Sequence, residues 1–314
     1  MADNSKQHFV PSSYLKAWCD PETPSGYEPY VWTFDREGGN PKKKAPANIF
    51  HETDMYTIKR MNGDRDLVLE QGLSQLEGSF VSIRKDKLAN HLPLEIDDHI
   101  LLCAFVAAAQ ARTPTSREHH REQWKRPLEI MEDMDRSIKN MTLKQKESFM
   151  SRQSMSSASE GRKGLSYEQV KALSEAPLQK MLFPLIQSTA PMLAKIDMAI
   201  LETDDSTGFI TSDNPCVWFD PVGYKRPPMY RGPALMYETI EITLPISPRQ
   251  MLLLNRHGAN GYLQADELML NEFNRRTRAF CGDSFVVRKN EVNPYWLEQG
   301  VEPADSWDAT HRNK

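Results

Sequence analysis

The sequence predicts an α+β fold in which a central helical layer, at about residues 66–195, packs on antiparallel strands contributed by both chain ends. Apolar residues recur at helical spacing in the middle of the chain, whereas both ends show the short alternation of strands. The stretch ILLCAFVAAA, residues 100–109, is apolar on every side, so a helix there must be surrounded by protein. Helices clustered between strand-rich ends are typical of α+β folds.

Composition limits the classes of protein to which the chain can belong. With 314 residues it can bury one or two cores, and we expect a single domain over residues 1–299. The net charge of -4 provides no global positive field, so general nucleic-acid binding is not favoured. The four cysteines include no Cys-x-x-Cys pair, which indicates reduced thiols.

No segment has the pattern of a membrane protein. The N-terminus lacks the basic start and long apolar stretch of a secretory signal, so we expect a cytoplasmic location. The run at residues 100–109 is about half of the roughly 20 residues that a spanning helix needs. We therefore predict a core helix there and no membrane partner.

The N-terminal part is predicted to form a small hairpin followed by helices. Residues 27–39 alternate and end at two glycines, which predicts a strand and a turn, and residues 54–60 are expected to be the partner strand. Residues 66–90 carry apolar positions at helical spacing. The apolar helix that follows is broken by Pro114, and a charged helix continues beyond it.

The second half changes from helix to strand. Residues 151–164 are rich in Ser and Gly without a hydrophobic period, which predicts a mobile insertion. Ser166 and Gln169 form a capping box for the next helices, and strands are expected from about Ile196 onward. One late helix at residues 265–280 precedes a last strand, and the polar residues 300–314 are expected to be a disordered tail.

The stretch FITSDNPCVWF, residues 209–219, contains the first candidate site. Asp213 and Asn214 precede a proline, which is typical of a tight turn because both side chains can bond local backbone. The turn also joins two apolar strands, and polar groups at strand ends are common in ligand sites. In that second interpretation Asp213 is a general base or holds a cation, and Asn214 orients a substrate.

Gln110 and Arg112 form the second candidate, at the end of the all-apolar helix. A guanidinium is costly to bury there without a partner, so we expect an acidic group beside Arg112. Glu70, Glu77 and Asp213 are the candidates for that partner. The alternative is a buried ion pair that fixes helix packing without any catalytic role.

Three further residues complete the predicted set. His8 lies among apolar residues, where a histidine is either a hydrogen-bonded core residue or a proton-transfer group. Asn271 and Asn274 occur three apart in a helix, where asparagine is a poor former, and this favours a polar, substrate-binding role. His119 and His120 are adjacent and point about 100° apart on a helix, so no metal site is predicted.

Several short segments follow one another in an order that resembles a known family. They include the His-x-x-Pro opening QHFVPSSYLKAW, the stretch AAAQARTP, the Thr-Ser-Asp-Asn-Pro centre, the Pro-x-Ser-Pro of LPISPRQMLLL and the late NEFNRRTRAF. Over residues 6–288 the chain is similar to the bacterial and fungal domain-of-unknown-function family 4238. The resemblance implies a family name and no activity.

Two hypotheses about function remain open. The mixture of base, cation and amide donors suits a hydrolase or transferase acting on a phosphate- or nucleotide-containing substrate. The alternative is a binding or sensing module without turnover, in bacterial stress or phage defence. The sequence contains no serine-hydrolase elbow, zincin, P-loop or Rossmann motif, and it indicates no cofactor or oligomeric state. The predicted catalytic residues are His8, Glu77, Arg112 and Asp213, and the predicted substrate-binding residues are Gln110, Asn214, Asn271 and Asn274.

Overall fold

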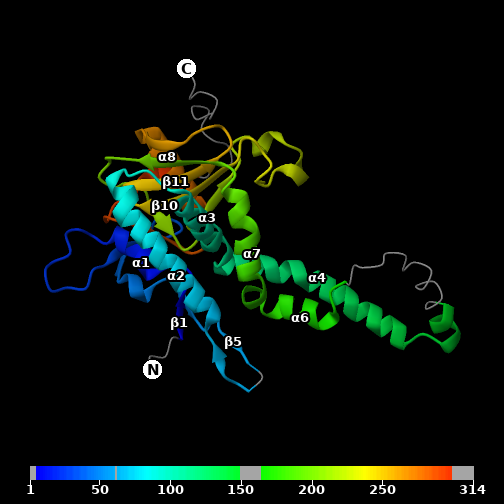
Figure 1. Cartoon of the computed structure of the whole chain (residues 1–314). Coiled ribbons are helices and arrows are strands. Elements are labelled where there is room, and N and C mark those ends of the chain that lie inside the picture. The colour runs from blue at the N-terminus through cyan, green and yellow to red at the C-terminus, as the bar shows by residue number, and fades with distance from the viewer. Residues whose placement is uncertain (1–4, 61, 149–163, 299–314) are drawn as a thin grey trace.

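The computed structural model describes residues 5–60, 62–148 and 164–298, and it confirms an α+β fold (Figure 1). The helices lie mainly in the middle of the chain, as the sequence predicts, and strands from both ends pack beside them. The main described helices are α1 (Ser12–Leu15), α2 (Val68–Ser82), α3 (Ile96–Ala111), α4 (Pro114–Lys139), α6 (Tyr167–Glu175), α7 (Pro177–Leu193) and α8 (Glu267–Ala279).

A five-stranded sheet forms the middle layer of the body. Its neighbours are antiparallel except for one parallel pair at the edge, β12 with β7. Every residue of β11 is buried, because the strand is covered on both faces. Leu252 and Leu254 belong to the core beside α3 and α7, whereas Met251 and Leu253 pack beside α8. In spatial order the strands are β12 (Gly261–Gln264), β7 (Asp197–Glu202), β11 (Gln250–Asn255), β10 (Glu241–Ser247) and β9 (Val217–Phe219).

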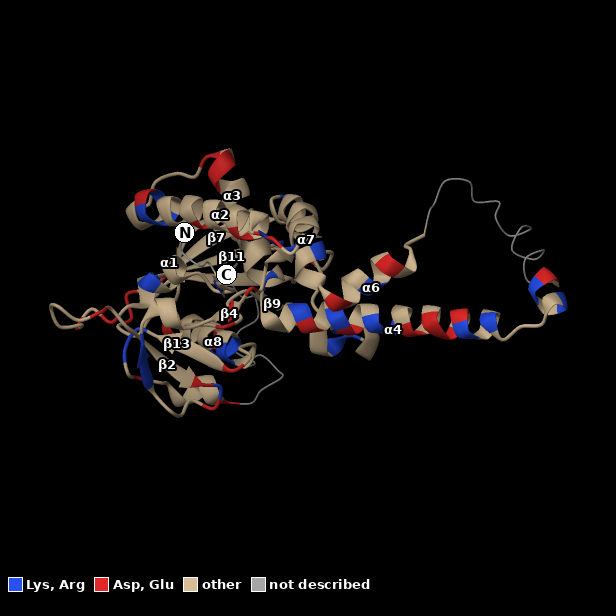
Figure 2. Cartoon of the chain, turned by 90° about the horizontal axis from the view of Figure 1, so that it is seen from below, with Lys and Arg blue, Asp and Glu red and all other residues tan. Residues whose placement is uncertain are grey.

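A second sheet of four strands joins the two ends of the chain. Figure 2 shows the resulting layers, with α2, α3 and α7 on one side of the first sheet and α8 and the second sheet on the other. The central pair is antiparallel and places Phe285 opposite Phe34. The strands are β3 (Lys42–Lys44), β2 (Val31–Asp35), β13 (Ser284–Val287) and β8 (Thr211–Ser212).

The predicted partner of β2 is wrong. β2 pairs with β3 and β13. Residues 54–60 contain only the short strand β5 (Ile58–Lys59), which pairs with β6 (Arg65–Asp66). The strand before them, β4 (His51–Thr53), pairs with β1 (Lys6–His8). β3 consists of three exposed lysines at a sheet edge. Charged residues are common on edge strands because they discourage pairing with other chains, so the hydrophobic pattern gives no sign of this strand.

The all-apolar helix α3 is central, as its composition predicts. It packs against α2 and α7, and its second half, from Leu102 to Ala111, is mostly buried. The rings of Phe80 on α2 and Phe105 on α3 stack with centroids 3.8 Å apart and an interplanar angle of 7°. α3 ends at Arg112, and Thr113 then caps α4 through its side-chain oxygen, with Pro114 as the first helical residue. The junction between α3 and α4 therefore sets the position of Arg112 at the C-terminal end of α3.

Helices α4 and α6 project from the body as a two-helix arm (Figures 1 and 2). α4 has no buried residue along its 26 residues, whereas eight of the 16 residues of α3 directly before it are buried. α6 begins at the predicted capping box, in which Ser166 and Gln169 bond each other's backbone. We call α4 and α6 together the arm.

Two predicted segments fall outside the described residues. These are the insertion at residues 151–164, apart from Gly164, and the tail at residues 300–314. Among the helices that the structure describes, none combines the length and the apolarity that crossing a membrane requires.

Candidate functional site

Arg112 and Glu77 form a buried ion pair where α3 ends. The Arg112 side chain is 1% exposed, and its Nη1 donates to Glu77 Oε1 over 2.7 Å. Glu77 lies about one turn before Phe80 on α2, and Arg112 lies about two turns after Phe105 on α3, so the ring stack brings the two ends together. The expected acidic partner of Arg112 is thus confirmed as Glu77.

Tyr56 fixes the backbone of the same junction. Its hydroxyl donates to the Arg112 carbonyl over 3.1 Å, and its own backbone N–H donates to the side chain of Gln7 on β1. Burial raises the pKa of Tyr56 far above its usual value, so the hydroxyl stays protonated and remains a donor. The Arg112 guanidinium also lies over the Phe105 ring, 5.8 Å from its centroid. The arginine is therefore held at both its backbone and its side chain.

His8 lies in the same electrostatic environment. Burial lowers the pKa of His8, and the neighbouring His51 and Arg112 lower it further, so the imidazole is neutral at neutral pH. The ring bonds the backbone of Ala47, and its Nε2 is buried without a hydrogen-bond partner among the described residues. A neutral ring that donates to a carbonyl through Nδ1 carries a lone pair at Nε2. This nitrogen can accept a proton.

Glu70 adds a second carboxyl group on the face of α2 that carries Glu77. Burial and the charge of Glu77 raise the pKa of Glu70, and Arg112 opposes that rise. Because the two glutamates are two turns apart, about 10.5 Å along the helix, they lie on the same side of α2. We call His8, Glu70, Glu77 and Arg112 the junction cluster.

Gln110 lies beside this cluster in the chain without joining it. The residue is half-buried in the last turn of α3, and no hydrogen bond of its side chain is found among the described residues. Two residues along a helix correspond to a rotation of about 200°, so Gln110 and Arg112 leave α3 on nearly opposite sides. A substrate-binding role for Gln110 remains a prediction.

Asp213 is separate from Arg112, contrary to one of the pairings considered for the sequence. Its carboxylate accepts the backbone N–H groups of Gly282, Asp283 and Ser284, at 2.7, 2.6 and 3.1 Å. Burial raises the pKa of Asp213, although these three donors favour the ionised form. Asn214 donates to the Phe280 carbonyl at 3.0 Å. Both side chains bond backbone, as in the turn interpretation, but that backbone belongs to residues 280–284, which lie 66 to 71 residues further along the chain and not in the local turn.

Asn271 and Asn274 have different environments although both lie on α8. Asn274 is fully buried, accepts from the Ile210 N–H and donates to the Gly208 carbonyl, each at 2.9 Å. Asn271 Oδ1 accepts from Asn293 and Trp296, and the residue lines a pocket of about 320 Å³. Asn274 therefore fastens the segment before β8, and neither side chain reaches the junction cluster.

Sequence reasoning missed a second buried ion cluster between β10 and α8. Arg276 donates to Glu241 over 2.6 Å and to Glu272 over 2.8 Å, and its guanidinium lies 3.9 Å from the centroid of the Phe219 ring. Burial opposes ionisation of Glu241, but Arg276 and His257 together outweigh it and lower the pKa of that carboxyl group. One signal was available, because Glu241 interrupts an apolar strand pattern. We call Arg275, Arg276, Glu241 and Glu272 the α8 network.

A family model for proteins of unknown function, DUF4238, matches residues 6–291. The chain belongs to the DUF4238 family. The match spans β1 to the end of the second sheet, so the junction cluster and the α8 network both lie within the DUF4238 region. No curated protein and no solved structure matches the chain. Within the described residues, no group of three or more His, Cys, Asp or Glu side chains could hold a metal ion.

Proposed function

We propose that this protein is a hydrolase or transferase that acts on a phosphate- or nucleotide-containing substrate at the junction cluster. One observation carries the proposal: His8 Nε2 and Arg112 Nε are both buried and lack a hydrogen-bond partner among the described residues. Buried polar atoms are seldom left unpaired, and exceptions are common at functional sites. Here one atom can accept a proton and the other can donate to an anion.

The chemistry divides between the members of the cluster. His8 Nε2 takes a proton from water, or from an acceptor hydroxyl in a transferase, while the oxygen attacks phosphorus. Arg112 donates to a phosphoryl oxygen as negative charge develops there. The ester P–O bond breaks, and the leaving oxygen takes a proton from Glu70, whose raised pKa favours the protonated form. Glu77 and Tyr56 position Arg112 without touching the substrate.

The surroundings of the cluster favour an anionic substrate. α4 begins at Pro114, immediately after the cap that follows Arg112, so the positive end of a long helix dipole lies at this junction. Arg117 in the first turns of α4 adds a cation, which pairs with Glu52 on β4. Because Glu52 already compensates the charge of Arg117, the positive end of α4 is the feature here that favours a phosphate.

A binding module without turnover is the second candidate, and one observation favours it. Asp213, Asn214 and Asn274 all bond backbone groups, which is what residues that fix a fold do. A role of such a module in bacterial stress or phage defence remains a prediction.

Phosphate-ester hydrolysis and ligand-induced stabilisation separate the two candidates. We expect the purified chain to hydrolyse para-nitrophenyl phosphate or ATP and to melt at higher temperature with inorganic phosphate. His8→Gln should lower turnover by about 100-fold or more while keeping the phosphate-induced shift, because general base catalysis contributes on that scale. Arg112→Lys should lose both responses. His119→Gln, on the exposed face of α4, is the matched control.

Two outcomes would decide against catalysis. A phosphate-induced shift that His8→Gln leaves intact, without turnover of either compound, would support the binding module. If the protein showed no turnover and no phosphate-induced shift, the junction cluster would be excluded as the site of a phosphate-containing ligand.

A further inference from the structure

The distal half of the arm has an apolar face that α6 does not cover. The Tyr167 hydroxyl, in the first turn of α6, donates to Glu132 Oε1 over 3.0 Å. From there α6 runs back along α4 toward the body, where Trp124 contacts Met181 of α7 (Figure 2). With 9 residues against 26, α6 covers only part of α4, and it leaves the residues of α4 beyond Glu132 uncovered.

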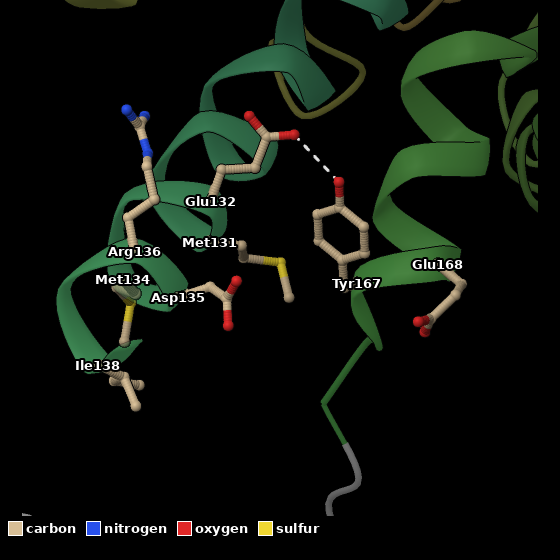
Figure 3. Close-up of a pocket in the computed structure, with 8 residues that line it drawn as sticks. All are labelled: Met131, Glu132, Met134, Asp135, Arg136, Ile138, Tyr167 and Glu168. Atoms are coloured by element: carbon tan, nitrogen blue, oxygen red, sulfur yellow. Dashed lines mark hydrogen bonds between the residues drawn. The ribbon is translucent and has the colours of Figure 1, made fainter. Parts of the chain in front are cut away.

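Two adjacent pockets lie along this uncovered part, and Figure 3 shows the residues that line the first of them. The first, of about 720 Å³, lies between α4 and the start of α6, and the second, of about 300 Å³, follows the next face of α4. They share Met134 and Ile138, so they form one continuous groove. Ile130 and Met134 are 51% and 52% exposed. We call this surface the arm groove: Ile130, Met131, Met134, Ile138, Met141 and Tyr167.

The apolar positions have the spacing of a helix-binding surface. Ile130, Met134 and Ile138 are four residues apart, and Met131 and Met141 each lie three residues from one of them, so they share one side of α4. Methionine side chains are flexible and polarisable, and they adapt to different apolar partners. A groove of this kind accepts the apolar face of an amphipathic helix.

Acidic side chains frame the groove. Four carboxylates line the two pockets, and two of them are already paired along α4, Asp133 with Arg136 and Asp135 with Lys139. Glu132 and Glu168 are the two that have no ion pair with a basic residue among the described residues. Glu132 is bonded by a neutral tyrosine hydroxyl, so that contact leaves its charge uncompensated. The frame therefore favours a partner with basic residues beside its apolar face.

We propose that the arm groove binds a basic amphipathic helix of a partner protein. A second copy of this chain fits less well, because two arms meeting at their grooves would bring the same acidic frames together. The basic residues near the root of α4 are already engaged, since Arg117 pairs with Glu52 and Arg121 with Glu118. The acidic frame likewise disfavours nucleic acid.

The test uses the full chain and a labelled model helix of leucine and lysine with helical amphipathic spacing. We expect fluorescence anisotropy to show saturable binding, which weakens as salt rises. Met134→Ser should weaken binding about tenfold, because it removes an apolar contact at the centre of the groove. Met134→Leu should bind like the parent, and Met229→Ser, at an exposed methionine far along the chain, is the matched control.

A scrambled leucine–lysine peptide of the same composition distinguishes a groove from charge attraction. Equal binding of the scrambled peptide, unchanged binding by Met134→Ser, or no binding at all would each overturn the proposal. Sedimentation at increasing protein concentration tests the remaining occupant. A self-association that Met134→Ser abolishes and the model helix does not displace would assign the groove to a second copy instead.

Discussion

Two buried arginines in this protein have different surroundings. Arg276 bonds two carboxylates, Glu241 and Glu272, whose side chains are 0% and 1% exposed between the first sheet and α8. Arg112 bonds one carboxylate, Glu77, whose side chain is 21% exposed, and Arg112 Nε has no hydrogen-bond partner among the described residues. The first arrangement is enclosed by the fold, whereas the second keeps donor capacity beside an unpaired imidazole nitrogen.

This difference separates a structural charge cluster from a candidate site. Enclosed ion pairs cost desolvation and give back little net stability, but removing one partner is severe because a buried charge is left behind. A pair that reaches the surface on one side can exchange a partner for water or ligand. Arginine–glutamate pairs thus occur both in a structural cluster and in a candidate site, and the exposure of the glutamate side chain distinguishes the two.

The largest expected effect is in the α8 network. Arg276→Met should lower the free energy of unfolding by about 3–5 kcal/mol, because it leaves Glu241 buried with only a half-buried histidine beside it. Urea denaturation of the variant and the parent measures the difference. Arg126→Met on the exposed face of α4 is the control and should change stability by no more than about 0.5 kcal/mol. If Arg276→Met lowered the free energy of unfolding by no more than about 0.5 kcal/mol, the α8 network would not be the more enclosed of the two clusters.

Glu77→Gln should have a smaller effect. The amide keeps an acceptor for Arg112, and water reaches this side of the pair, so we expect a loss of about 1–3 kcal/mol. The comparison uses the same urea titration as Arg276→Met. If Glu77→Gln were the more costly of the two changes, the junction cluster would be the enclosed one and its role would be packing.

Asp213→Asn tests whether the turn is independent of Arg112. The variant keeps one acceptor oxygen for the three backbone donors, so a loss of about 1 kcal/mol is expected, on the scale of a lost cap. Thermal melting with and without inorganic phosphate should show an unchanged phosphate response. If the variant melted like the parent but lost the phosphate-induced shift, Asp213 would belong to the phosphate-binding site.

The smallest effect concerns pH. Because the pKa of His8 is lowered in the folded chain, the unfolded chain takes up a proton first as pH falls below its usual value of 6.5. The stability associated with neutral His8 is therefore present above 6.5 and is lost as pH falls. His8→Gln should flatten this decline in urea midpoints measured across neutral and mildly acidic pH, while His119→Gln should not. Equal slopes for all three proteins would show that His8 does not titrate differently on folding.

The sequence predicts much of the fold because the relevant signals are local. The apolar helix at 100–109 and the strands of residues 241–255 carry continuous hydrophobic runs, and burial on both sides is the condition that such runs satisfy. β3 was missed because three exposed lysines have no hydrophobic period. The partner of β2 was misassigned because strand pairing can join residues far apart in the sequence, and β13 lies about 250 residues after β2.

The candidate site was predictable only in part for a similar reason. The cost of burying a guanidinium correctly indicated an acidic partner for Arg112, and the stacked rings of α2 and α3 decided which glutamate it is. Nothing local distinguishes Asp213 as a turn residue from Asp213 as a base, because both interpretations use the same neighbours. The α8 network was missed although Glu241 and Arg276 are 35 residues apart, the same separation as Glu77 and Arg112, because Arg276 lies in a polar helix sequence that gives no sign of a buried guanidinium.

The root of the arm gives the junction cluster a mechanical connection to a distant surface. α4 has 26 residues, so it is about 39 Å long at about 1.5 Å per residue, and it starts two residues after Arg112. For a rigid rod of that length, a tilt of about 5° at the root moves the tip by about 3 Å. If α4 tilts as a rigid body about the Thr113 cap, a partner that holds its far end also restrains the backbone of Arg112.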